Sequence, residues 1–376
     1  MDKRPKPLRF RQDGTFRIMQ VSDIQESPNV CGDSLEFLKS ALQQEKPDLV
    51  IFTGDQLKGY SPYFHVPGGE LKAGTTLHKI LKPFADKGIP FLVTFGNHDA
   101  QSGLTNRQQM YYYLQYPECV NTMENPEDCG TCCVTIAGKD GKPAFAIYVI
   151  DSNSDRFAPV KSSQLDWYRR TRDHLAHENG GHYLPSLVFQ HIPVPEFYEF
   201  LQEVPKGTPH AISAFGNRRG HCYLLDKSKV YGGELGEAPC IPESNSGELE
   251  TLAEAGDVLG LFVGHDHRNS FWGPLHGIDA GYAPCCGFNT YGPGPDRAVR
   301  MFTLHEKDPF HYDTELLSYH DLFGRKVSHP MRDLFLDKFP ATPEQMLHIL
   351  IQTAALTGSA AYLFYKFYKY QKKAKK

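Results

Sequence analysis

Residues 259–267 read LGLFVGHDH, a short apolar run followed by two histidines. The run 259–263 is bounded by glycine, which predicts a buried β-strand. His265 and His267 then lie just past its carboxyl end, where open α/β sheets bind their ligands. In an extended loop the two imidazoles project to the same side, and neutral imidazole is a common ligand of divalent metals. A lone His-x-His is more often ordinary surface, so the interpretation depends on the other strands.

Other apolar runs end in side chains of the same chemical kind. The runs 16–21, 48–53, 90–95, 185–190 and 259–263 are followed by Asp23, Asp55, Asn97 with His98, His191, and His265 with His267. Helical patterns at 33–46 and 77–87 separate the first three runs, which favours parallel crossovers and a sheet covered on both faces. The carboxyl ends of such strands meet at one edge, so we expect a metal site there. Two further runs, 298–304 and 310–319, predict antiparallel strands of a second sheet packed on the first.

The length of 376 residues, 40% of them hydrophobic, suits one large domain with insertions or two domains. Weakly periodic segments predict insertions at about 100–141 and 196–247, the second being of the length of a functional lid. We expect four regions: a basic segment 1–14, the main domain 15–325, a linker 326–341, and a hydrophobic helix with a lysine-rich end at 342–376.

Net charge and cysteine content limit the classes of partner, and the cellular compartment, that we expect for this chain. The net charge is −4, yet residues 366–376 contain six lysines and no acids, so the rest of the chain is more acidic still. This argues against a stable nucleic-acid partner. Residues 1–14 lack an apolar signal region, and nine cysteines, an odd number, fit a reducing compartment. We therefore expect a cytoplasmic protein.

The length and composition of the carboxyl-terminal segment suggest that it associates with a membrane. Residues 346–365 have about the length needed to cross a bilayer, and lysines follow them. An interfacial helix and a helix docked on the core are the alternatives. Residues 346–376 are therefore a candidate segment for association with a membrane.

Taken together, the motifs resemble those of the calcineurin-like metallophosphoesterase superfamily from about residue 16 to 269, nearest the branch that contains the purple acid phosphatases. They are Asp23-Ile24-Gln25, Gly54-Asp55, Gly96-Asn97-His98-Asp99, His191 and Gly264-His265-Asp266-His267. The resemblance implies a four-layer αββα sandwich of two mixed β-sheets. It also implies two divalent metal ions (Mn, Fe, Zn or Mg) at the carboxyl ends of the strands.

The same resemblance implies roles for the residues. Asp23 and His267 would hold one metal, Asn97, His191 and His265 the other, and Asp55 would bridge them. Two cations can clamp a phosphoryl group and generate a hydroxide that attacks phosphorus. His98 would assist the leaving oxygen, with Asp99 as its orienting partner.

Two positions depart from the family pattern. Gln25 stands where the family commonly has a histidine ligand, so it either binds a metal weakly through its amide oxygen or lies outside the ligand set. Lys58 stands where purple acid phosphatases have the tyrosine that gives their colour. We therefore predict a colourless protein.

The function expected from these features is hydrolysis of a phosphomonoester or phosphodiester. Cations of the 196–247 loop, Arg218, Arg219 and His221, are candidates to meet the substrate phosphate. One alternative is a nucleotide or phospholipid phosphodiesterase. Another is a metal-binding scaffold with weak catalysis, because Gln25 replaces the usual histidine.

Overall fold

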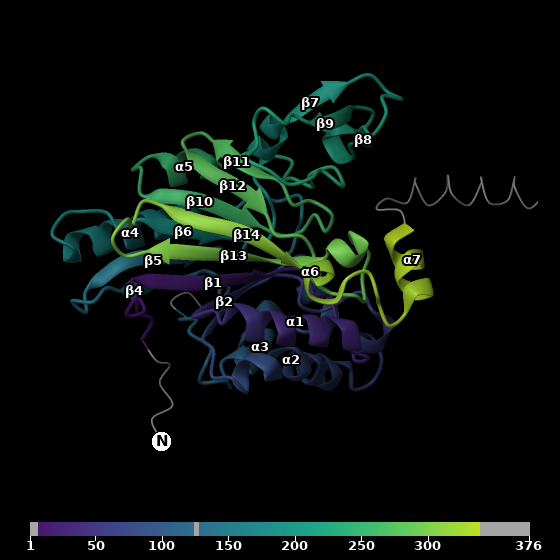
Figure 1. Ribbon diagram of the computed structural model, residues 1–376, viewed down its shortest axis with the longest axis horizontal. Helices are drawn as coiled ribbons and strands as arrows, with labels where there is room; N and C mark the ends of the chain where they lie inside the picture. Colours follow the sequence, from purple (N-terminus) through teal and green to yellow (C-terminus); the bar gives the residue numbers. More distant parts are fainter. Residues whose placement is uncertain (1–6, 124–127, 339–376) are drawn as a thin grey trace, which may run out of the picture.

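Two large β-sheets packed face to face form the centre of the structure, a computed structural model that describes residues 7–123 and 128–338 (Figure 1). The strands are β1 (Thr15–Val21), β2 (Leu49–Thr53), β3 (Phe91–Thr94), β4 (Cys132–Ala137), β5 (Pro143–Val149), β6 (Ser186–Phe189), β7 (Leu201–Val204), β8 (Ile212–Ser213), β9 (Cys222–Leu225), β10 (Val258–Val263), β11 (Trp272–Leu275), β12 (Ile278–Tyr282), β13 (Ala298–His305) and β14 (Tyr312–Ser318). The α-helices are α1 (Gly32–Glu45), α2 (Gly69–Ala85), α3 (Asn106–Tyr113), α4 (Ser162–Glu178), α5 (Glu248–Ala253), α6 (Tyr319–Phe323) and α7 (Pro330–Lys338). Short 3-10 helices are η1 (Pro62–Phe64), η2 (Asp99–Ser102), η3 (Pro195–Phe200), η4 (Gly216–Arg218) and η5 (Gly294–Asp296).

Both large sheets combine parallel and antiparallel strand pairs. The first sheet has the order β14-β13-β1-β2-β3, and β1, β2 and β3 are parallel because α1 and α2 connect them. The second has the order β11-β12-β10-β6-β5-β4, in which β5, β6, β10 and β12 are parallel. A small third sheet, β7-β9-β8, lies at the end of the molecule within the expected lid segment (Figure 1).

Successive side chains of a strand face different layers of the fold. In β1, Ile18 packs into the core between the two sheets, whereas Met19 packs with α1, α2 and α3. In β6, Phe189 belongs to the same inner core, whereas Val188 packs with α4 and α5. Helices therefore cover both outer faces, and the predicted four-layer αββα sandwich with two mixed sheets is confirmed.

Three details differ from the expectations. The antiparallel strands β13 and β14 do not begin a second sheet: β13 pairs with β1 and extends the first one. Within the expected insertion at 100–141, Cys132–Ala137 forms the edge strand β4, and Met110 of α3 lies in the core. The expected linker 326–341 contains α7, which is anchored where Ser328 Oγ donates to Asp33 Oδ1 at 2.6 Å.

The membrane expectation concerns residues 346–376, which lie outside the described residues. Among the helices of residues 7–123 and 128–338, none has the length and apolar character of a membrane span.

Candidate metal centre

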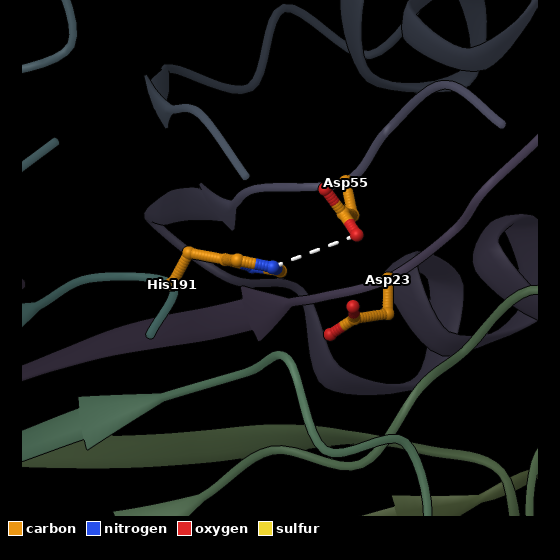
Figure 2. Close-up of side chains that lie close together, drawn as sticks. All are labelled: Asp23, Asp55 and His191. Atoms are coloured by element: carbon orange, nitrogen blue, oxygen red, sulfur yellow. Dashed lines mark ion pairs between the residues drawn. The ribbon is translucent and has the colours of Figure 1, made fainter. Parts of the chain in front are cut away.

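Three buried side chains from three strand ends meet at one point. Asp23 follows β1, Asp55 follows β2 and His191 follows β6 (Figure 2). One ligand atom of each lies within 4.8 Å of those of the other two, and Asp55 Oδ2 is 3.5 Å from His191 Nε2. Their exposed fractions are at most 1%. Two buried carboxylates beside an imidazole are a chemically suitable set for a divalent cation.

The remaining predicted ligands surround these three. His267 Nε2 is 3.3 Å from Asp23 Oδ1, and His265 Nδ1 is 3.2 Å from His191 Nε2. Asn97 Oδ1 is 3.3 Å from the same His191 nitrogen. The structure therefore brings together Asp23, Asp55, Asn97, His191, His265 and His267.

The loops that carry these residues have unusual backbone conformations. Asp23, Gln25, Asp55 and His265 all have positive φ, at 52°, 41°, 53° and 73°. Non-glycine residues rarely adopt this region, and strain of this kind concentrates at functional sites. At Gly264, a Cβ atom would lie 2.7 Å from Asp23 Oδ2, so only glycine lets the histidine loop approach that carboxylate.

Backbone carbonyl oxygens orient two of the imidazoles. His191 Nδ1 lies 2.9 Å from the Thr53 carbonyl oxygen, and His267 Nδ1 lies 2.8 Å from that of Tyr291. A carbonyl can only accept, so these Nδ1 atoms carry protons and the Nε2 lone pairs face the cluster.

Asp23 Oδ1, an atom of the predicted metal ligands, is buried and lacks a hydrogen-bond partner among the described residues. A buried acceptor without a donor is costly, and a cation would satisfy it. The residues present therefore fit a metal ion on structural grounds.

The electrostatics of the cluster also favour a cation. Burial alone would raise the pKa of Asp55, but the neighbouring His191 and His98 hold it below its ordinary value. Burial opposes a charge on His191, yet Asp55 and Asp23 raise its pKa to about 9. In place of a cation, the carboxylates thus favour a second proton on His191, at Nε2, where a bound metal would instead supply the positive charge.

Gln25 does not present the atom that a metal would need. Its Nε2 donates to Asp55 Oδ2 at 3.0 Å and lies 3.1 Å from His267 Nε2. Its Oε1 accepts from Tyr60 at 3.2 Å and from Thr290 at 2.9 Å. An amide nitrogen has no lone pair to give, so ligation by Gln25 would require the amide to turn over.

His98 and Asp99 take different places. His98 lines the cavity above the cluster, its Nε2 3.9 Å from Asp55 Oδ2 and its Nδ1 2.9 Å from Gln101 Oε1. Asp99 was expected to orient His98, but its carboxylate accepts from the backbone N–H of Asp55, Gly96 and Leu57 at 2.8–3.0 Å. Asp99 is therefore a positioning residue for the Asp55 loop, and Gln101 is the partner of His98.

A cavity of about 340 Å³ opens above the cluster. Besides the expected residues it is lined by Tyr60, Arg156, Glu237 and Tyr291, which sequence reasoning missed as site residues. They come from loops without periodicity or motif. None of the three loop cations expected to meet the phosphate, Arg218, Arg219 and His221, lines this cavity. His221 instead lies 2.7 Å from Glu203.

Comparison with known proteins identifies the family of this chain. Residues 16–269 match the family model for calcineurin-like phosphoesterases. The chain is 31% identical over 341 residues to "Probable inactive purple acid phosphatase 14" of Arabidopsis thaliana, covering 79% of this chain and 77% of that protein. It is 25% identical over 304 residues to "Phosphatase DCR2" of Saccharomyces cerevisiae, covering 72% and 47%. A solved dimetal phosphatase from Danio rerio aligns with a TM-score of 0.47 and 13% identity, over 81% of this chain and 99% of that chain. From the family match and the Arabidopsis relative, the chain belongs to the calcineurin-like phosphoesterase family.

Proposed function

We propose that this chain is a metal-dependent hydrolase of phosphomonoesters or phosphodiesters. The observation that carries the proposal is the buried cluster of Asp23, Asp55 and His191, in which Asp23 Oδ1 has no hydrogen-bond partner among the described residues. Membership of the phosphoesterase family supports the same chemistry.

Each residue of the cluster would have a defined task. The cations would be held by Asp23 and His267 on one side and by Asn97, His191 and His265 on the other, with Asp55 between them. Two divalent ions there would neutralise phosphoryl charge and lower the pKa of water. Thr53 and Tyr291 keep the Nε2 lone pairs of His191 and His267 aimed inward through their carbonyl oxygens.

His98 is suited to proton transfer at the leaving group. Its side chain is partly exposed to the cavity, and its ring packs edge-on against Tyr60 at 4.7 Å between centroids. Gln101 occupies Nδ1, which leaves Nε2 as the nitrogen that can give a proton to the departing oxygen. We expect His98→Ala to slow the hydrolysis of phosphate esters of aliphatic alcohols by about 10²- to 10⁴-fold, and to slow that of nitrophenyl esters less.

The direct test is hydrolysis of nitrophenyl phosphate and bis-nitrophenyl phosphate by the full chain loaded with manganese. Asp55→Asn should abolish turnover, whereas Asp86→Asn, the same change at an exposed ion pair with Lys82, should leave it unchanged. Full activity of Asp55→Asn would exclude this cluster as the catalytic site.

The orientation of Gln25 favours a second candidate function, a metal-binding scaffold with little turnover. Its amide nitrogen faces Asp55 and His267, where the family commonly has a histidine. The name "Probable inactive" of the Arabidopsis relative is in keeping with it. Gln25→His separates the two functions: a gain of metal and of turnover over an inactive parent chain supports the scaffold, and an already active parent supports the enzyme.

A further inference from the structure

A second cavity adjoins the cavity above the cluster of Asp23, Asp55 and His191, which we call the metal cavity. Its volume is about 390 Å³, and Phe215 lines both hollows. Each volume lies within the range of about 300–1,000 Å³ that is typical of small-molecule sites. The metal cavity is rich in polar and charged groups, whereas the second combines the aromatic rings of Phe157, Tyr198 and Phe215 with Arg218 and with polar residues of the segment 243–245. We call this second hollow the aromatic cavity.

The two cavities have continuous walls. Cys240 lines the metal cavity, and its chain neighbours Pro239 and Ile241 line the aromatic cavity. Arg156 lines the first and Phe157 the second, with the Arg156 guanidinium 4.7 Å from the centre of the Phe157 ring.

The shared wall is tied directly to the metal loop. The Cys240 N–H donates to the carboxylate of Asp266, between His265 and His267, at 3.1 and 3.2 Å. Tyr282 also donates to that carboxylate, at 2.7 Å. A ligand that spans both hollows would therefore meet walls held at a fixed position relative to the metal ligands.

The aromatic cavity has the chemistry of a ring-binding site. The Arg218 guanidinium lies 4.2 Å above the Tyr198 ring, so it is already stacked as a flat cationic plate. Aromatic faces and a stacked guanidinium bind planar rings, and base stacking on such side chains is tolerant of ring identity. A flexible acyl chain offers neither a π-face nor a polar group to the Arg218 guanidinium of this wall.

We propose that the aromatic cavity binds the planar ring of a phosphate ester, such as the base of a nucleotide, while its phosphate lies at the metal centre. The inference rests on the proposed function for the position of the phosphate. The ring site itself does not depend on turnover, and it can be tested separately.

The test uses the full chain with adenosine and ribose as probes, which carry no phosphate and are not substrates. Saturation-transfer NMR and titration should show binding of adenosine but not of ribose. Phe157→Ala and Arg218→Ala should each weaken adenosine binding about tenfold. Arg219→Ala, the same change at a neighbour that lines neither cavity, should leave the affinity unchanged.

Other results would overturn the proposal. Adenosine binding no tighter than ribose, or equal affinities in all three variants, would exclude the ring site. Tighter binding of decanol than of adenosine would identify an acyl site instead.

Kinetics with the manganese-loaded chain separate this proposal from the proposed function. We expect kcat/KM for adenosine monophosphate to exceed that for glycerol phosphate, and Arg218→Ala to lower their ratio about tenfold. Variant-sensitive adenosine binding without hydrolysis of any ester would keep the ring site and contradict the hydrolase. Hydrolysis of both esters at equal rates, without adenosine binding, would support the hydrolase and contradict the ring site.

Discussion

Glu248 makes stability depend on pH in a direction opposite to that of most carboxylates. It begins α5, is buried, and its side chain interacts with Gln190, the residue before His191. Glu248 Oε1 and Gln190 Oε1 have no hydrogen-bond partner among the described residues. Burial raises the pKa of Glu248 to about 8; the hydrogen bond with Gln190 opposes this rise, and the nearby charge of Glu196 adds to it.

The size of the effect follows from the difference between the two pKa values. The folded value is about 8 and the ordinary value is 4.5, so the folded chain keeps a proton that the unfolded chain releases between them. Stability from this group is therefore lost as the pH rises through this window. The loss is about 2.5 kcal/mol between pH 5 and pH 7, and about 5 kcal/mol over the whole window. Glu248→Gln keeps the shape of the side chain and removes the ionisation.

The assay is urea unfolding of the parent chain and of Glu248→Gln at pH 5, 7 and 9. The stability of Glu248→Gln relative to the parent chain should rise by about 2–3 kcal/mol from pH 5 to pH 7 and level off above pH 8. Glu250→Gln, an exposed position of the same helix, should follow the parent chain at each pH. A constant difference between Glu248→Gln and the parent chain would refute the reasoning.

Two further substitutions test the loops around the cluster. Gly264→Ala would place a Cβ atom 1.8 Å from Ser22 Oγ and 2.7 Å from Asp23 Oδ2, so we expect a stability loss of about 1–3 kcal/mol in urea unfolding, and unchanged stability would contradict the close approach. Asp99→Asn replaces one oxygen that accepts backbone N–H groups by a donor, and should cost about 1–3 kcal/mol and lower manganese affinity about 10- to 100-fold by calorimetry. Parent-like affinity in Asp99→Asn would show that the Asp55 loop does not need this support.

The sequence predicted the strand ends well because two kinds of pattern coincide there. Buried parallel strands read as continuous apolar runs, and each run ends where a polar residue becomes available to the site. Asp23 and Asp55 follow the adjacent parallel strands β1 and β2 of the first sheet, and the packing of the second sheet on the first brings His191, at the end of β6, to the same place. Topology, rather than any single motif, therefore made these positions predictable.

Other features depend on contacts that no local pattern encodes. Apolar alternation predicts that residues 298–304 form a strand but does not say which sheet it joins, and β13 pairs with β1. The amide orientation of Gln25 depends on Thr290, which is distant in sequence. The aromatic cavity is built from loops such as 215–218 and 239–245, which have no periodicity to read.

The most direct test of the account is the metal content of the full chain after equilibration with manganese and removal of free ion, measured by mass spectrometry of the elements. We predict that the parent chain retains manganese and that Asp55→Asn loses it, because Asp55 stands between the ligands from both sheets. A parent chain that retains none, or an Asp55→Asn variant that retains as much as the parent, would contradict the convergence of these strand ends on a metal.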